Sequence, residues 1–143
     1  MKKNNKGFSL VELIIVIAIM AILAGALAPA LIKYIAKSRR STDVSNAQTI
    51  ATAVTNALSV EDAYDSAVAG SYTVSDSGAQ LGNAGAFNSE VTSQLGKSNF
   101  KPKYEKNAHF FINLESDKST FQVGVKSSSK EVVLYPDVDK SYK

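Results

Sequence analysis

The sequence predicts an α+β protein in which a long N-terminal helix packs on a small antiparallel β-meander. Three observations carry this prediction. A long apolar run begins the chain, an amphipathic stripe continues it, and three short segments rich in aromatic and β-branched residues follow near the C-terminus. A length of 143 residues leaves room for one globular domain of ordinary size beside the helix.

The apolar run extends from Leu13 to Ile32, 20 residues without a charged side chain. A helix of that length spans about 30 Å, the hydrocarbon thickness of a bilayer, and it has no polar face, so it predicts a membrane-spanning segment. Gly25 and Pro29 lie inside the run and predict a kink, because both residues weaken a helix. Glu12 stands at its edge, where a carboxylate is costly if it lies deep in the bilayer.

Basic residues flank both ends of the run, so the charge rule gives no orientation. The very short leader, and a polar domain that lies wholly after the run, predict a cytoplasmic N-terminus. Lys37, Arg39 and Arg40 form either a collar facing lipid headgroups or a set of cations that meets acidic residues of a neighbouring subunit. The acidic candidates are Asp43, Glu61, Asp62 and Asp65.

The helix is expected to continue beyond the membrane surface, from about Ser9 to Leu58. No Gly other than Gly25, and no Pro other than Pro29, falls between these limits. The outer half shows apolar residues at helical spacing among Ser, Thr, Asn and Gln, which predicts an amphipathic helix. This stripe consists of Val44, Ala47, Ile50, Ala51, Val54, Ala57 and Leu58.

The segments after the helix are less regular. Ser59 to Ala69 either continues the helix or begins a second one, with Ser59 and Asp62 as a weak capping box. Gly70 to Gly85 predicts a loop from its four glycines, and Asn88 to Leu95 predicts one or two helical turns.

Three strands are expected, at 109–114, 120–125 and 131–135, and their short connections predict an antiparallel order. One face of this sheet is expected to be apolar and to cover the amphipathic half of the helix. The residues of that face are Phe110, Ile112, Leu114, Phe121, Val123, Val125, Val132 and Leu134. The charged tail from Pro136 either lies over the sheet or hangs free.

Composition excludes several kinds of chemistry. There is no cysteine, so thiol chemistry and zinc sites built on cysteine are excluded. No phosphate-binding loop or metal-ligand spacing is recognisable, so we expect no enzyme activity, cofactor or metal. His109 is expected at a strand end without a carboxylate partner, and Asp137 with Asp139 is only a weak calcium candidate. The net charge of +3 comes from the three lysines before Gly7, so strong nucleic-acid binding is not expected.

The stretch from Lys6 to Leu13 reads KGFSLVEL and resembles the N-terminal signature of type IV pilins and type II secretion pseudopilins. The resemblance implies that a prepilin peptidase and methyltransferase cuts between Gly7 and Phe8 and methylates the new amine of Phe8. It also implies that Glu12 pairs with the Phe8 amine of a neighbouring subunit during fibre assembly. Pro29 matches a helix-kinking proline that is common in that family.

The resemblance implies a structural subunit that polymerises into a cell-surface pilus used for adhesion, twitching motility or aggregation. The subunit would wait in the cytoplasmic membrane, in contact with lipid and the pilus assembly machinery, before it joins identical subunits in a helical filament. The expected parts are a leader of residues 1–7, a membrane and filament-core half at 8–35, and an exported domain at 36–143.

Two alternatives remain at this stage. One is a pseudopilin of a type II secretion or competence system, because the signature is shared. The other is a secreted binding module released by signal peptidase, with a small-x-small cleavage site at Ala24–Ala26.

Overall fold

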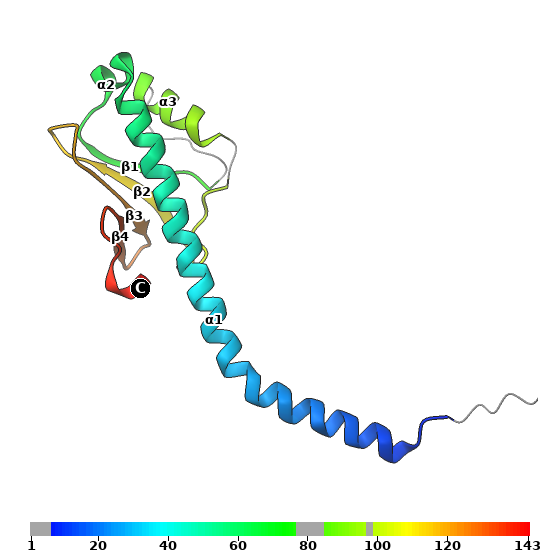
Figure 1. The fold of residues 1–143 in the computed structure, drawn as a ribbon. Coiled ribbons are helices and arrows are strands. Elements are labelled where there is room, and N and C mark those ends of the chain that lie inside the picture. Colours follow the sequence, from blue (N-terminus) through cyan, green and yellow to red (C-terminus); the bar gives the residue numbers. More distant parts are fainter. Residues whose placement is uncertain (1–6, 77–84, 97–98) are drawn as a thin grey trace, which may run out of the picture. The chain divides into compact units, whose positions relative to one another are not determined.

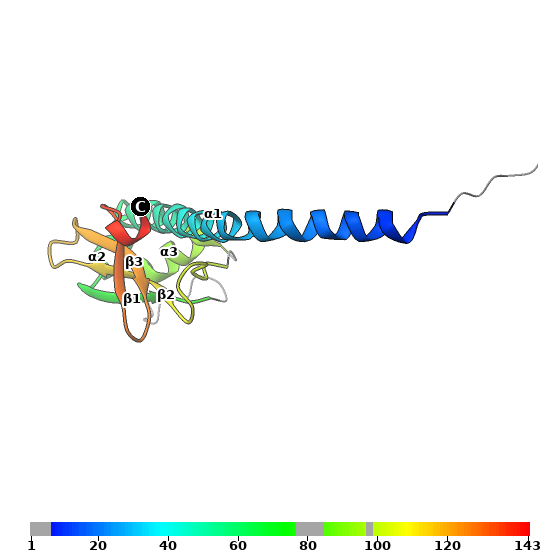
Figure 2. The same ribbon diagram turned by 90° about the horizontal axis from the view of Figure 1, so that it is seen from below.

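A computed structural model describes residues 7–76, 85–96 and 99–143 (Figures 1 and 2). The chain divides into two compact units, one ending at Ala36 and the other extending from Lys37 to Lys143. The elements in chain order are α1 (Leu10–Leu58), α2 (Glu61–Ser66), β1 (Gly70–Val74), α3 (Ala86–Leu95), β2 (His109–Leu114), β3 (Phe121–Lys126), β4 (Glu131–Tyr135) and a short 3₁₀ helix, η1 (Lys140–Tyr142).

Helix α1 confirms the prediction of one continuous helix, since it begins at Leu10 and ends at Leu58. Pro29 lies inside it, and helical structure continues through Gly25 and Pro29 without a break. The first unit contains the α1 residues up to Ala36, and none of them is buried. Helix α1 is long enough and apolar enough to cross a membrane.

The second unit is built on a four-stranded antiparallel sheet with the strand order β1-β2-β3-β4. The α+β class and the antiparallel order are confirmed, but the number of strands is corrected from three to four. The missed strand is β1, whose residues Gly70–Val74 were expected in a loop. Its register with β2 runs from Gly70 opposite Leu114 to Val74 opposite Phe110, so Tyr72 and Val74 bury their side chains while Ser71 and Thr73 stay exposed. The rest of the expected loop, residues 77–84, lies outside the described residues.

The inner face of the sheet and the later half of α1 form one hydrophobic core, and this half of α1 lies against one side of the sheet in both views (Figures 1 and 2). All eight residues predicted for the apolar face are buried. In α1 the buried residues are Asp43, Ala47, Ile50, Ala51, Ala53, Val54 and Ala57. Val44 and Leu58, at the two ends of the predicted stripe, are only half-buried and pack at the margin of the core.

Helices α2 and α3 cover one end of this core. The Phe87 amide donates to the Ser66 hydroxyl at 2.8 Å, which ties the start of α3 to the end of α2. The predicted cap at Ser59 is wrong, because the residue before α2 is Val60 and no side chain caps it. The Ser59 hydroxyl instead donates back to the Thr55 carbonyl of α1 at 2.9 Å.

Gly124 marks an irregularity in the sheet. The register between β3 and β4 shifts between Val123 and Gly124. Gly124 also stands directly opposite Phe111 in β2, whose buried ring lies over it on the face away from the core. A side chain at Gly124 would meet the Val132 carbonyl and come within 2.7 Å of the Phe111 ring. The glycine is therefore required by a close approach of neighbouring groups.

Candidate functional site

The predicted processing site lies just before α1. Gly7, Phe8 and Ser9 are outside the helix and exposed, and Phe8 is 88% exposed. At the helix start the Ser9 amide donates to Glu12 Oε2 at 2.9 Å, and the Glu12 amide donates to Ser9 Oγ at 3.3 Å. This reciprocal pair is a capping box, which satisfies two amides that the first turn of a helix leaves without intrahelical partners.

The capping box gives Glu12 a role that the sequence analysis missed. Glu12 was interpreted as a carboxylate that pairs with the amine of a neighbouring subunit, but in this structure it accepts a hydrogen bond from the amide of its own Ser9. The signal was present in the sequence, because Ser followed three residues later by Glu before an apolar run is the pattern of a capping box. Phe8 lies next to Ser9, so the carboxylate is held close to the predicted cleavage point of its own chain, whereas the predicted pairing is with the Phe8 amine of a neighbouring subunit.

The membrane-length half of α1 exposes its apolar side chains on every side. None of its residues is buried, and a Cβ placed on Gly25 would have nothing within 4 Å. The exposed large apolar residues are Leu10, Val11, Leu13, Ile14, Ile15, Val16, Ile17, Ile19, Met20, Ile22, Leu23, Leu27, Leu31, Ile32 and Ile35. An apolar surface of this extent needs partners that the described chain does not supply. The predicted kink at Gly25 and Pro29 stays a prediction.

Comparison with known proteins agrees with this arrangement. Residues 2–28 match the prokaryotic N-terminal methylation motif. The chain is also 42% identical over 61 residues to the type IV major pilin protein PilA of Myxococcus xanthus. Over its N-terminal part the chain is therefore similar to type IV pilins. The matched segment spans 43% of this chain and 28% of the relative, and no solved structure gave a significant match.

Asp43 is not the surface acid that the sequence analysis expected. It is fully buried, and its carboxylate accepts hydrogen bonds from the amides of Lys103 and Tyr104 at 2.7 and 2.9 Å. Burial raises the pKa of Asp43, although the two amides act to lower it. The carboxylate therefore fixes the segment before β2 to α1 and is not free to meet a cation of another subunit.

Arg40 is also used within the domain. Its guanidinium lies 4.7 Å from the centre of the Tyr104 ring, and its Nη1 lies 3.4 Å from the carbonyls of Ser141 and Lys143. Tyr142 is buried and lies edge-on to Tyr104. The tail is thus folded against the domain, which decides between the two alternatives that the sequence left open for it.

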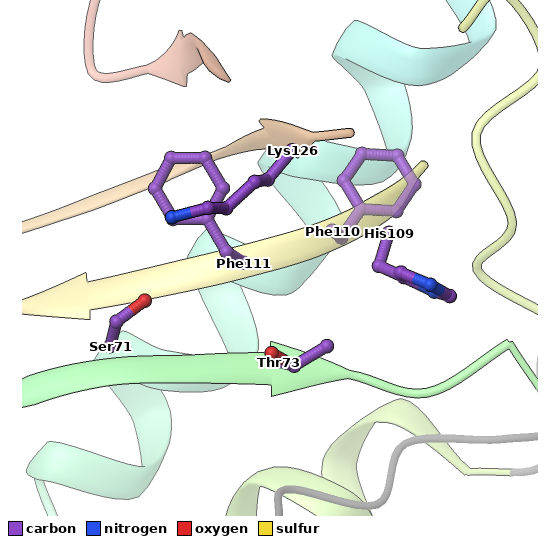
Figure 3. Close-up of a pocket in the computed structure, with 6 residues that line it drawn as sticks. All are labelled: Ser71, Thr73, His109, Phe110, Phe111 and Lys126. Carbon is purple, nitrogen blue, oxygen red and sulfur yellow. The ribbon is translucent and has the colours of Figure 1, made fainter. Parts of the chain in front are cut away.

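The outer face of the sheet carries a shallow hollow of about 300 Å³ that has both polar and aromatic lining residues (Figure 3). Its lining includes Ser71 and Thr73 of β1, His109 of β2 and Lys126 of β3. His109 does have a carboxylate partner, contrary to expectation: its Nδ1 lies 3.2 Å from Asp76 Oδ1.

The acidic residues near the C-terminus do not assemble a cation site within the described residues. No group of three or more His, Asp or Glu side chains is placed to hold a metal there. Asp139 accepts from the amide and hydroxyl of Ser141, which caps η1. The Ser141 amide and hydroxyl lower the pKa of Asp139 by stabilising its ionised form.

Proposed function

We propose that this chain is a structural subunit, not an enzyme, that polymerises through its apolar helix half into a cell-surface type IV pilus. The observation that carries the proposal is the unburied apolar half of α1 directly after a prepilin processing motif. Lipid covers this surface before assembly, and the helices of identical subunits cover it in the filament.

Assembly begins with processing by a prepilin peptidase and methyltransferase. Cleavage between Gly7 and Phe8 releases an amine beside the Glu12 carboxylate, and methylation keeps its positive charge. A charge that enters a low-dielectric filament core needs a close partner of opposite sign. Glu12 of one subunit then exchanges its own Ser9 amide for the Phe8 amine of a neighbour.

The first test is the intact mass and N-terminal sequence of protein sheared from cells that express the chain. A methylated Phe8 start in filamentous material supports the proposal. A start near Leu27, after loss of the apolar helix half, would mean a secreted domain and would end the fibre argument.

The second test is Glu12→Ala, compared with Glu61→Ala as a control in the exposed first turn of α2. Glu12→Ala should leave cleavage intact and remove most sheared fibre, whereas the control should assemble normally. Normal fibres from Glu12→Ala would contradict the pairing. Gly7→Val should leave an uncut precursor in the membrane fraction.

Long surface fibres favour a pilus, because a pseudopilin forms a short fibre that moves other proteins or DNA. Electron microscopy of the sheared material therefore tests this part of the proposal. Adhesion, motility and aggregation are then separated by surface-attachment and spreading assays on a deletion strain.

A further inference from the structure

A basic hollow lies where the second unit begins. Lys37, Arg40, Ser41 and Val44 of α1 form one wall, with helical spacings of 3, 1 and 3 residues. The tail residues Val138 and Tyr142 form the other wall, and Lys143 lies at its rim. The hollow has a volume of about 350 Å³.

The hollow is lined by basic side chains that have no acidic partner among the described residues. Three of its lining residues are basic and none is acidic. Lys37 makes no ion pair or hydrogen bond with any part of the chain that the structure describes. The guanidinium of Arg40 lies over the Tyr104 ring and its Nη1 makes two long contacts to carbonyls, but it forms no ion pair with a carboxylate among those residues. The nearby carboxylate of Asp43 accepts hydrogen bonds from two backbone amides.

The position of these residues along α1 matches the depth of lipid headgroups. Lys37 and Arg40 follow Ile35, the last residue of the predicted membrane half, by two and five residues. A helical rise of 1.5 Å per residue puts them about 3 and 8 Å beyond it. The headgroup layer of one leaflet is roughly 5–8 Å thick, and lysine side chains reach along a helix to place their charge in it.

We propose that Lys37, Arg40 and Ser41 bind the phosphate of an anionic phospholipid headgroup. This proposal rests on the membrane-anchored state of the proposed function. Arg and Lys side chains with a hydroxyl are a common donor set for phosphate oxygens. The position of Lys37 and Arg40 two and five residues beyond Ile35 favours a lipid phosphate over free phosphate, because a site at headgroup depth meets lipid phosphates at a high local concentration.

Arg39 is the matched control, because it lies in the same basic cluster but does not line the hollow. A diffuse collar attracts anionic lipid through total charge, so loss of Lys37, Arg39 or Arg40 would then weaken retention equally. A built site predicts unequal effects. We expect Lys37→Gln and Arg40→Gln to lower retention about fivefold each, and Arg39→Gln to change it little.

The experiment uses the full chain in nanodiscs of phosphatidylcholine mixed with phosphatidylglycerol, followed by native mass spectrometry of retained lipid. Arg40→Lys, and the near-ultraviolet circular dichroism of each variant, separate loss of the site from loss of the fold. Equal effects at the three basic positions, or no preference for phosphatidylglycerol in the unaltered chain, would overturn the site. Displacement of the lipid by inorganic phosphate at similar concentration would show a plain anion site and overturn the lipid assignment. Fibre shearing on the same strains tests the proposed function separately, since fibres can form whether or not lipid is retained selectively.

Discussion

The two halves of α1 are parts of one helix, yet the first half exposes its apolar side chains and the second half buries most of its own. The half up to Ala36 is the most hydrophobic stretch of the chain and buries no residue. The half after Lys37 is mostly polar by composition and buries seven residues, most of them alanine or β-branched. Hydrophobicity alone therefore does not predict burial within the chain. The arrangement of apolar residues on one helix face does, because a single stripe can be covered by a sheet.

The largest expected effect on folding comes from the buried half. Ile50→Ala removes a side chain with no exposed surface and should lower the free energy of unfolding by about 2–5 kcal/mol, through lost burial and the cavity left behind. Ile22→Ala is the matched change in the other half, where the isoleucine is 71% exposed, and should leave the unfolding of the second unit unchanged. Denaturant titration of both variants in detergent, followed by tyrosine near-ultraviolet circular dichroism, compares them. Equal losses would break the contrast between the halves.

Asp43 sharpens the contrast, because it is a charged residue buried in the more polar half. Asp43→Ala leaves the amides of Lys103 and Tyr104 without partners and should cost about 2–3 kcal/mol. Asp43→Asn keeps one acceptor oxygen and should cost less.

The pH dependence of stability gives a second measurement on Asp43. Burial raises the pKa of Asp43 in the folded state above its value in the unfolded chain. The contribution of its proton binding to the free energy of unfolding is therefore full below the unfolded pKa and is lost as the pH rises through the folded pKa. The Asn variant should lack this dependence. An Asn variant with the same pH profile as the unaltered protein would assign the titration to another group.

A substitution at Gly124 tests how tightly the sheet is packed where it covers the second half of α1. Gly124→Ala forces a methyl group against the Val132 carbonyl and the Phe111 ring, and should cost about 1–3 kcal/mol. Gly85→Ala is the control, since its Cβ would meet only Ser66 at an ordinary 3.9 Å. Thermal unfolding of the two variants provides the measurement, and similar midpoints would show that the sheet adjusts freely.

The smallest effect is expected at the turn between β2 and β3, far in sequence from either half of α1. The amide of Thr120, with the hydroxyls of Ser119 and Thr120, lowers the pKa of Asp117 to about 2. A lowered folded pKa means that this carboxylate adds stability above its unfolded pKa and loses that contribution as the pH falls from about 4 to 2. Asp117→Ala should be slightly less stable than the unaltered protein at pH 7, and the difference should shrink as the pH falls through about 2. A stability difference between the two proteins that stays the same down to pH 2 would show that the packing of the Asp117 side chain, and not its ionisation, stabilises the turn.

The elements that the sequence predicted well are those with a strong periodic signal. The helix boundaries and the inward residues of β2, β3 and β4 follow from helical spacing and from strand alternation. β1 was missed because its five residues contain Gly70 and small polar side chains, and only Tyr72 and Val74 point inward. An edge strand of this kind is defined by its pairing partner more than by its own sequence.

The candidate site was predicted in outline only. Gly7 and Phe8 follow from the motif, but the bond between Ser9 and Glu12 was overlooked because Glu12 was judged by its membrane depth. The burial of Asp43 and the partners of Arg40 could not be predicted. Both depend on residues 60 or more positions away, and nothing local to α1 indicates them.

The capping box has an electrostatic consequence for maturation. The start of a helix carries a partial positive charge, so a cation released at Phe8 would be repelled by α1 itself. The Glu12 carboxylate already lies at that helix end and offsets this repulsion before the cation exists. We expect cleavage between Gly7 and Phe8 to change the helix end from an anionic cap into a nearly neutral pair of charges. The mature helix end would then carry almost no net charge where it meets the apolar run that begins at Leu13.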